Sequence, residues 1–256
     1  MNKSILPIVV YSHSEYIDIL NVQTSYIAEY ERKILLINKN IESEILNNLS
    51  TNYTQIIFYD DSLPYASRLL ALSELKDDYM LLLHDMDILV SQDAIIMDCL
   101  HSIAVNNSID RIDLQSNLNY TSDNENNIRI TDDCTASLYK AEDPSTYIYN
   151  VNPSIWKVST LLNVMGLHSG ETYRSIETSS IQNTCSKLSM YKIHGTEQLV
   201  CGYYCCHKFF QFLHLTHGGK YLPVQETNFT NELRDEYQYI CENFLKNTSR
   251  EFNTQR

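Results

Sequence analysis

Basic residues are scarce in this chain, and long apolar runs are missing from it. Lysine and arginine number 19 against 32 aspartates and glutamates, which gives a formal net charge of -13. Nucleic-acid backbones and anionic membrane surfaces repel such a chain, so we expect neither as its main partner. No apolar run approaches the roughly 18 residues of a membrane-spanning helix, and the first residues lack a signal-peptide pattern. We therefore expect a cytoplasmic protein without a transmembrane segment.

A regular cysteine framework is also missing. The 7 cysteines are odd in number and loosely spread, which suits a reducing compartment better than a set of disulfides. Cys201, Cys205, Cys206 and His207 have the spacing C-x-x-x-C-C-H, but a second matched pair of zinc ligands is lacking. Reduced, buried thiols are therefore the preferred interpretation of these residues.

Apolar and amphipathic segments alternate regularly over the first 105 residues. The expected strands are Ile5–Tyr11, Lys33–Ile37, Thr54–Tyr59 and an apolar strand beginning at Tyr79. The expected helices are Glu15–Glu31, Ile41–Leu49, a helix through Leu69, and Asp93–Val105 with Ser91 as its cap. This alternation predicts an α/β fold with a mostly parallel sheet, whose ligands bind at the carboxyl ends of the strands.

The second half of the chain is less regular. We expect strands at Ile109–Leu114, Leu199–Tyr204 and Phe209–Thr216, and helices at Pro153–Met165, Ile176–Leu188 and Asn231–Lys246. Residues 115–133 are polar and predict a long surface loop of the kind that holds substrates.

The stretch Tyr79–Val90 (YMLLLHDMDILV) combines a buried strand with an acidic triplet. Asp85 and Asp87 follow the strand directly, so two hard oxygen ligands stand at the edge where open α/β sheets bind nucleotides. A D-x-D triplet is weak evidence by itself, and an ordinary acidic surface turn is the competing interpretation. Its position after a strand is what adds information.

Two later pieces extend this pattern. Glu177 opens an expected helix between a polar loop and a Tyr-Lys-Ile strand, and residues 209–223 (FFQFLHLTHGGKYLP) end an aromatic strand in two histidines, paired glycines and a lysine. Glycines allow the backbone to approach a phosphate, and Lys220 supplies a point charge beside them.

Together these pieces resemble the glycosyltransferases of the GT-A fold, over most of the chain to about Pro223. The resemblance implies a GT-A-like, Rossmann-like sheet flanked by helices, a nucleoside-diphosphate sugar donor linked to UDP or dTDP, a glycan or saccharide acceptor, and Mn²⁺ or Mg²⁺ as cofactor. By this resemblance Asp87 binds the metal and Asp85 contacts the ribose or the metal, while His214 or His217 completes the metal site. The residues expected near base, ribose or diphosphate are Ser12, His13, Asp60, Asp61, Arg68 and Lys220.

Glu177 is the expected catalytic base, because inverting enzymes of this fold often carry an acidic residue at the corresponding helix start. Ile176 stands where those enzymes usually have an acidic neighbour, which departs from the pattern. Glu142, Asp143 and Glu171 are alternatives for the base. We expect one domain, residues 1–256, with a nucleotide-binding half (1–105), an acceptor and catalytic half (106–222) and a C-terminal helical tail (223–256).

Two other functions compete with glycosyl transfer. A sugar-phosphate nucleotidyltransferase needs a similar sheet and a cation, but usually has a glycine-rich phosphate loop after the first strand, and residues 11–16 (YSHSEY) contain no glycine. A non-catalytic nucleotide- or glycan-binding relative is the third possibility, and Ile176 is its best support.

Overall fold

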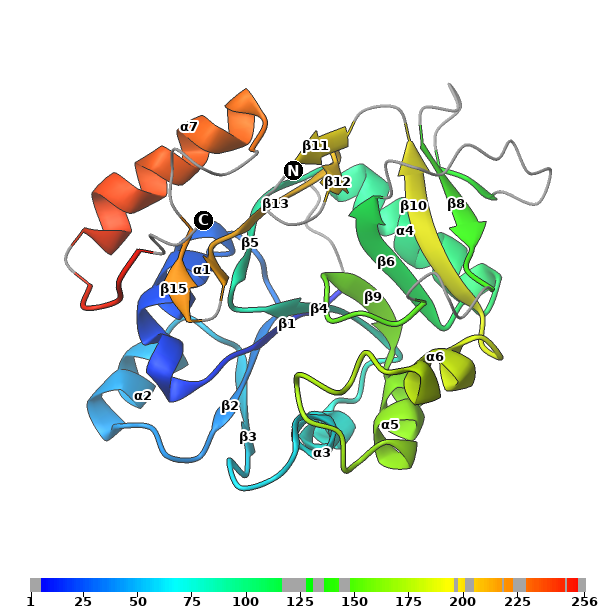
Figure 1. Cartoon of the computed structure of the whole chain (residues 1–256), viewed down its shortest axis with the longest axis horizontal. Helices are drawn as coiled ribbons and strands as arrows, with labels where there is room; N and C mark the ends of the chain where they lie inside the picture. Colours follow the sequence, from blue (N-terminus) through cyan, green and yellow to red (C-terminus); the bar gives the residue numbers. More distant parts are fainter. Residues whose placement is uncertain are drawn as a thin grey trace.

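The computed structural model describes residues 6–116, 128–130, 136–142, 148–195, 198–200, 205–217, 219–222, 229–246 and 248–252. It has the expected α/β architecture, a large central sheet with helices on both faces (Figure 1). The strands of the large sheet are β1 (Ile8–Tyr11), β2 (Lys33–Asn38), β3 (Gln55–Tyr59), β4 (Tyr79–His84), β6 (Arg111–Ser116), β7 (Ile128–Arg129), β8 (Ala136–Lys140), β9 (Ser154–Lys157), β10 (Met190–Gly195), β11 (Gln198–Val200) and β12 (Cys205–His207). The α-helices are α1 (Ile17–Tyr26), α2 (Ser43–Ser50), α3 (Tyr65–Leu69), α4 (Ala94–Asn106), α5 (Val158–Leu167), α6 (Ser179–Cys185) and α7 (Asn231–Ile240).

The strand order of the large sheet is β3-β2-β1-β4-β9-β6-β10-β8-β7. Neighbours among β3, β2, β1 and β4 are parallel, as are β6 and β10, whereas β9 runs antiparallel between β4 and β6. The sheet is therefore mostly parallel, as the alternating pattern predicted. Along the sheet the strand numbers fall from β3 to β1 and then rise to β4, which is a reversal of the strand order. Ligands bind open α/β sheets at the carboxyl ends of the two strands that flank such a reversal, here β1 and β4.

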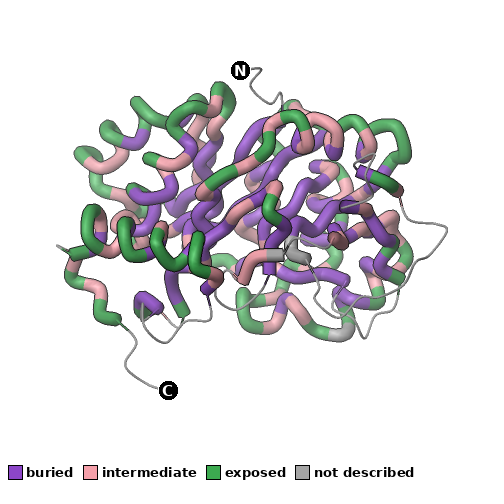
Figure 2. Tube along the Cα trace, turned by 90° about the horizontal axis from the view of Figure 1, so that it is seen from above, coloured by how far each residue is buried: buried purple, intermediate pink, exposed green. Residues whose placement is uncertain are grey.

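Alternate residues of each strand pack on opposite faces of the sheet. Ile8 and Val10 join a core with α1, α4 and α7, whereas Val9 and Tyr11 join a second core with α3, α5 and α6. Figure 2 shows the consequence, with buried strands in the middle and exposed residues on the outer helices. Strands covered on both faces are continuously apolar, which is why these segments are recognisable in the sequence.

The acidic triplet is followed by a strand that the sequence analysis did not predict. β5 (Asp87–Gln92) begins within the triplet and pairs antiparallel with β13 (Phe210–His214). Ser91 therefore lies in a strand, and the predicted cap is wrong. Asp93 caps α4 instead, because its carboxylate accepts hydrogen bonds from the amides of Ile95 and Ile96.

Two helix starts in the second half also differ from expectation. The segment predicted as a helix from Pro153 begins as strand β9, and α5 follows it only at Val158. Trp156 is buried in this strand beneath Tyr149. The β-strand propensity of the Ile155-Trp156 pair and its place between β4 and β6 outweigh the helical spacing. Most of the predicted 115–133 loop lies outside the described residues.

The short hairpin β14 (Thr216–His217) and β15 (Lys220–Tyr221) follows β13 directly. The chain then reaches α7, whose last turn widens into a π-helix at Cys241–Leu245. Within the described ranges, none of the helices combines the length and apolar character needed to cross a membrane.

Candidate functional site

Ser12 and Asp85 meet at the carboxyl ends of β1 and β4. The Ser12 hydroxyl donates a hydrogen bond of 2.6 Å to Oδ2 of Asp85, and the Asp85 amide donates to the carbonyl of Tyr11. Asp85 is only 5% exposed. Burial raises the pKa of Asp85 to about 7, although the hydrogen bond from Ser12 opposes the shift. The carboxyl group is therefore poised to lose its proton when a cation approaches it.

His13, Asp61 and Arg68 form a second group beside this edge. Nδ1 of His13 accepts a hydrogen bond from the amide of Glu15, so Nε2 carries the proton and donates to Asp61 at 3.0 Å. Arg68 donates to the carbonyls of Asp61 and Leu63 and lies over the Tyr59 ring. Arg68 therefore holds the loop that presents Asp61, and Tyr59 anchors it from below.

Asp60 stands apart from this group. Its carboxylate is solvent-exposed and accepts hydrogen bonds from the amide and hydroxyl of Ser62, which hold its pKa below the ordinary value. Those contacts shape the turn after β3. The structure therefore brings Ser12, His13, Asp61 and Asp85 to one edge but leaves Asp60 in the turn beside it.

Asp87 and His214 are joined across the β5–β13 pair. Their backbones are direct partners in the strand register, and Nδ1 of His214 lies 2.7 Å from Oδ1 of Asp87. Asp87 is 3% exposed, and His214 is only slightly more accessible. Of the two histidines left open by the sequence, His214 is thus the one that reaches the acidic triplet. His217 lies on β14 and is exposed.

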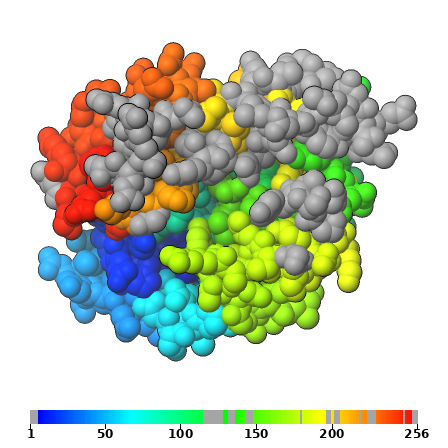
Figure 3. Space-filling model, in the orientation of Figure 1, coloured from blue at the N-terminus to red at the C-terminus, as the bar shows by residue number. Residues whose placement is uncertain are grey.

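His214 and His217 line a pocket of about 680 Å³ that opens beside the acidic triplet. Its other walls come from Tyr16, Met86, Tyr173, Arg174, Thr216 and Gly219. In Figure 3 the blue N-terminal residues, the yellow-green residues near 170 and the orange residues near 215 come together near the middle of this face. Three segments far apart in the sequence therefore enclose one cavity.

Tyr173 and Arg174 are pocket residues that the sequence analysis missed. Tyr173 packs edge-on against Tyr65 and donates its hydroxyl proton to the sulfur of Met86. Arg174 is exposed at the pocket. A single arginine in a polar loop carries no sequence signal for such a role, because only the fold brings it to the same pocket as His214.

His84 lies beneath the acidic triplet and is fully packed. Its Nε2 lies 2.7 Å from the hydroxyl of Tyr65, and its ring contacts Tyr11 and Tyr173. Burial lowers the pKa of His84 to about 4, an effect that the nearby charge of Asp87 only partly offsets. His84 is therefore neutral at pH 7 and acts as a packed strand residue.

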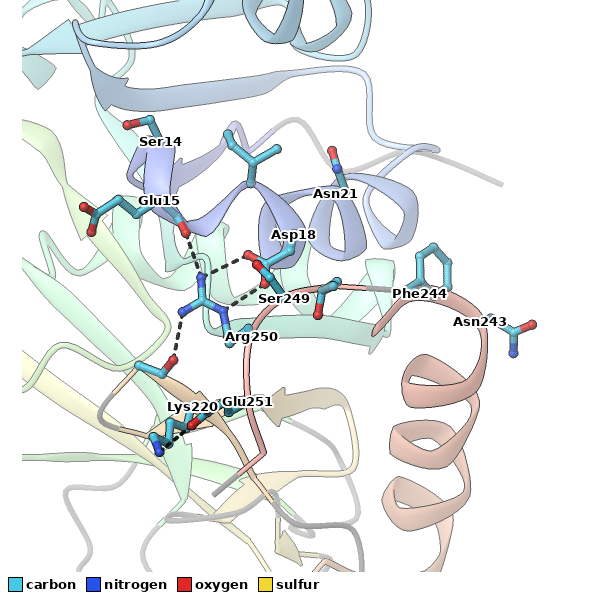
Figure 4. Close-up of a pocket in the computed structure, with 13 residues that line it drawn as sticks. Ser14, Glu15, Asp18, Asn21, Lys220, Asn243, Phe244, Ser249, Arg250 and Glu251 are labelled. Carbon is cyan, nitrogen blue, oxygen red and sulfur yellow. Dashed lines mark hydrogen bonds and ion pairs between the residues drawn. The ribbon is translucent and has the colours of Figure 1, made fainter. Parts of the chain in front are cut away.

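Lys220 projects into a neighbouring pocket of about 870 Å³, drawn in Figure 4, where its ammonium group binds Glu251 at 2.8 Å. Gly219 lines both pockets, so the two cavities share the turn of the β14–β15 hairpin. Gly219 has a φ of 79°, a conformation that side chains disfavour. Gly218 lies outside the described residues.

Glu177 precedes α6 by two residues instead of opening it. Oε1 of Glu177 accepts a hydrogen bond of 2.9 Å from the amide of Val151. Burial raises the pKa of Tyr173, and the negative charges of Asp87, Asp85 and Glu177 raise it further. Among the alternatives, Glu142 pairs with Lys140, and Asp143 lies outside the described residues.

The described residues contain no cluster of three or more histidine, cysteine, aspartate or glutamate side chains ready to hold a metal ion. Asp87 and His214 alone offer one carboxylate oxygen and one imidazole nitrogen, and Asp85 stands two residues before Asp87. Such donors suit Mn²⁺ or Mg²⁺, and these ions commonly take their remaining ligands from substrate phosphates and water. The pair therefore fits a cation that arrives with a diphosphate.

The cysteine-rich segment offers nothing comparable. The thiols of Cys205 and Cys206 are buried, and His207 is buried beside them against the ring of Phe209. Cys201 lies outside the described residues.

No family model matches the chain, and no curated protein matches it. Several solved structures are similar to it. A cytidylyltransferase from Leptospira borgpetersenii serovar Hardjo-bovis aligns over 74% of this chain and 75% of its own, with 12% identity and a TM-score of 0.46. A 4-diphosphocytidyl-2C-methyl-D-erythritol synthase from Anaerococcus prevotii aligns over 75% and 88%, with 12% identity and a TM-score of 0.40. A UDP-glucose pyrophosphorylase bound to UDP-glucose aligns over 75% and 92%, with 7% identity and a TM-score of 0.42.

Proposed function

We propose that the protein is a glycosyltransferase that moves a sugar from a UDP- or dTDP-linked donor to a hydroxyl group of a saccharide, with Mn²⁺ or Mg²⁺ and with inversion. The observation that carries this proposal is the 2.7 Å contact between Asp87 and His214, because His214 also lines an open pocket. A carboxylate and an imidazole from distant segments meet where a donor diphosphate has room to bind.

Asp87 and His214 would hold the cation, and Asp85 would contact it or the donor ribose. When bound, the cation stabilises the negative charge that develops on the departing diphosphate, an effect worth several kcal/mol. Both carboxylates are buried, so their interaction with a cation is screened less by water than it would be on an exposed surface. Ser12 fixes the orientation of Asp85 through its hydrogen bond.

Arg174 supplies a second cation at the pocket. Its guanidinium group suits phosphate oxygens, which it can bind through two parallel hydrogen bonds. In this proposal Arg174 binds the diphosphate from the side opposite the metal pair. The His13 and Asp61 pair lies beside the same edge and binds the nucleoside.

Glu177 is the proposed base, which takes the proton of the acceptor hydroxyl as that oxygen attacks the anomeric carbon. The bond between this carbon and the diphosphate breaks, and the nucleoside diphosphate leaves. The hydrogen bond from the amide of Val151 occupies Oε1 of Glu177 and holds the carboxylate in place. Proton removal by a positioned carboxylate typically contributes about 10²–10⁴-fold to the rate.

The backbone hydrogen bonds of the segment that follows β1 argue against a nucleotidyltransferase. Such an enzyme binds a nucleoside triphosphate through free backbone amides, most often in a glycine-rich loop. Here the amide of Ser12 donates to the carbonyl of Leu36, and the amide of Ser14 donates to the side chain of Asn38. The amides of Glu15 and Tyr16 both donate to His13, the first to its Nδ1 and the second to its carbonyl oxygen. A triphosphate that bound any of these amides would have to displace the hydrogen bond that the amide already makes. The segment is therefore better suited to contacting a nucleoside than to cradling a triphosphate.

The proposal is tested by incubating purified protein with a panel of nucleotide sugars and saccharide acceptors, with Mn²⁺ or with EDTA. We expect metal-dependent release of the nucleoside diphosphate. A parallel assay supplies nucleoside triphosphates and sugar phosphates and measures pyrophosphate, because the names of the similar structures describe nucleotidyl transfer. Pyrophosphate release without sugar transfer would replace the proposal, and metal-dependent nucleotide binding without either reaction would indicate a non-catalytic binding protein.

A further inference from the structure

Arg250 lines the pocket drawn in Figure 4, and its guanidinium group binds several partners at once. Nε and Nη2 donate to the two oxygens of the Asp18 carboxylate, at 2.8 and 3.1 Å (Figure 4). Nη1 donates to the carbonyl of Gly219 at 2.8 Å. Nη2 also donates to the carbonyl of Glu15 at 2.7 Å. The guanidinium carbon lies 4.4 Å from the centre of the Tyr16 ring. One side chain near the C-terminus thus joins α1 to the hairpin that follows β13.

The segment around Arg250 is itself attached to this hairpin. The amide of Tyr221 donates to the carbonyl of Glu251, Lys220 pairs with the Glu251 carboxylate, and the ring of Phe252 packs against Tyr221. Residues 248–252 therefore lie along β15, and we call them the C-terminal clasp.

Two of the residues that Arg250 contacts also shape the proposed donor pocket. Gly219 and Tyr16 both line the pocket that contains His214 and His217. Gly219 has few conformational constraints of its own, so its carbonyl needs a fixed partner to keep the hairpin turn in one position. Arg250 supplies that partner, and its guanidinium group also stacks on the ring of Tyr16.

We propose that the C-terminal clasp is part of the donor site, with Arg250 as the residue that positions the hairpin after His214. This inference rests on the proposed function, since it concerns the affinity of the same pocket for a metal-bound diphosphate. Arg250 touches neither the donor nor the cation. It acts through Tyr16 and Gly219. In this way it sets the distance from the acidic triplet to the pocket wall that the β14–β15 hairpin forms.

The charge and shape of arginine are both needed for this role. Four of the five guanidinium hydrogens are used, and they point in fixed directions toward three separate acceptor groups. Lysine has the same charge but cannot reach the Asp18 carboxylate and both carbonyls from a single ammonium group. Loss of residues that support metal-site residues from outside typically weakens metal binding by about 10–100-fold.

Calorimetric titration of the full chain with UDP in the presence of Mn²⁺ tests the inference. We expect Arg250→Gln and Arg250→Lys each to weaken binding by about 10–100-fold, the range cited for supporting residues. Arg32→Gln is the matched control, because Arg32 also donates two hydrogen bonds to one carboxylate, that of Asp77, far from both pockets. This control should lower the melting temperature without changing the affinity for UDP.

Asp18→Asn provides a second route to the same result if Arg250→Gln does not fold. The asparagine keeps the size of the side chain but removes the charge that orients Arg250, so binding should weaken in the same direction. Wild-type affinity in folded Arg250→Lys and Asp18→Asn variants would overturn the inference and leave the proposed function standing. If the wild-type protein itself shows no Mn²⁺-dependent UDP binding, the proposed function fails, and the role of the clasp fails with it.

Discussion

Asp87 and His214 are 127 positions apart in the sequence, and their side chains meet at 2.7 Å. The contact depends on the antiparallel pairing of β5 with β13, which sets the two residues directly opposite each other. Directly opposed residues of two strands bring their side chains close together. The pairing thus connects the edge formed by the carboxyl ends of β1 and β4 with the β14–β15 hairpin, which lines the pocket.

His214→Gln should weaken Mn²⁺ binding in the presence of UDP by about 10–100-fold, as loss of a group at a metal site does. His217→Gln should have the smaller effect, because His217 lies on the exposed hairpin strand and His214 is the residue in contact with Asp87. Electron paramagnetic resonance of free Mn²⁺ during titration measures both affinities. Equal effects of the two variants would remove the basis for choosing His214.

Arg174→Gln should raise the KM for the nucleotide sugar by about tenfold or more, since a hydrogen bond to a charged group contributes roughly 1.5–3 kcal/mol. The same variant should weaken UDP binding and leave uridine binding unchanged, because uridine has no phosphate. Arg234→Gln is the control, an arginine on α7 whose side chain donates to the carbonyl of Phe229 and is not among the residues that line the two pockets. A parallel loss of uridine binding in Arg174→Gln would indicate a distorted pocket instead.

Glu177→Gln separates a catalytic role from a structural one. Glutamine still accepts the hydrogen bond from the amide of Val151, so the melting temperature and donor binding should stay close to those of the wild type. It cannot take up a proton, so kcat should fall by about 10²–10⁴-fold. Unchanged kcat would assign Glu177 to the local fold alone and return attention to Glu171 or Glu142.

The ion pair between Asp18 and Arg250 predicts a pH dependence of stability. Burial alone would raise the pKa of Asp18, but hydrogen bonds from Arg250 and Tyr221 hold it below its ordinary value. A lowered carboxyl pKa in the folded state stabilises the fold above the unfolded pKa, and this contribution is lost as pH falls through the folded pKa.

The free energy of unfolding of wild type and Asp18→Asn, measured by urea titration from pH 7 to pH 2.5, tests this dependence. The wild-type advantage should be constant near neutral pH and shrink below about pH 4, where free aspartate takes up its proton. An advantage that does not change with pH would show that the pair contributes through packing and not through its charge.

The first half of the fold could be predicted because its strands are apolar on both faces and end in polar residues. Ser12, Asp61 and Asp85 follow three such strands, and parallel strands bring their carboxyl ends to one edge. β5 escaped prediction because it begins in the acidic triplet and follows β4 after only two residues. Asp93 took the capping role expected of Ser91, since its carboxylate reaches two amides of the first helical turn.

The remaining site residues could not be found from local sequence. Arg174 and Arg250 are single arginines in polar segments, and their roles depend on contacts with residues far away in the chain. The position of Glu177 relative to α6 also depends on its contact with Val151, which belongs to a different segment. Tertiary contacts of this kind override local patterns most often at sites that bind ligands.

The most direct test of the account is anomalous scattering at the manganese edge from crystals grown with Mn²⁺ and UDP. We expect one strong peak at coordination distance from both the Asp87 carboxylate and the His214 imidazole, with the diphosphate of UDP completing the site. A peak bound to other residues, or UDP bound in the absence of a peak between Asp87 and His214, would contradict the central claim.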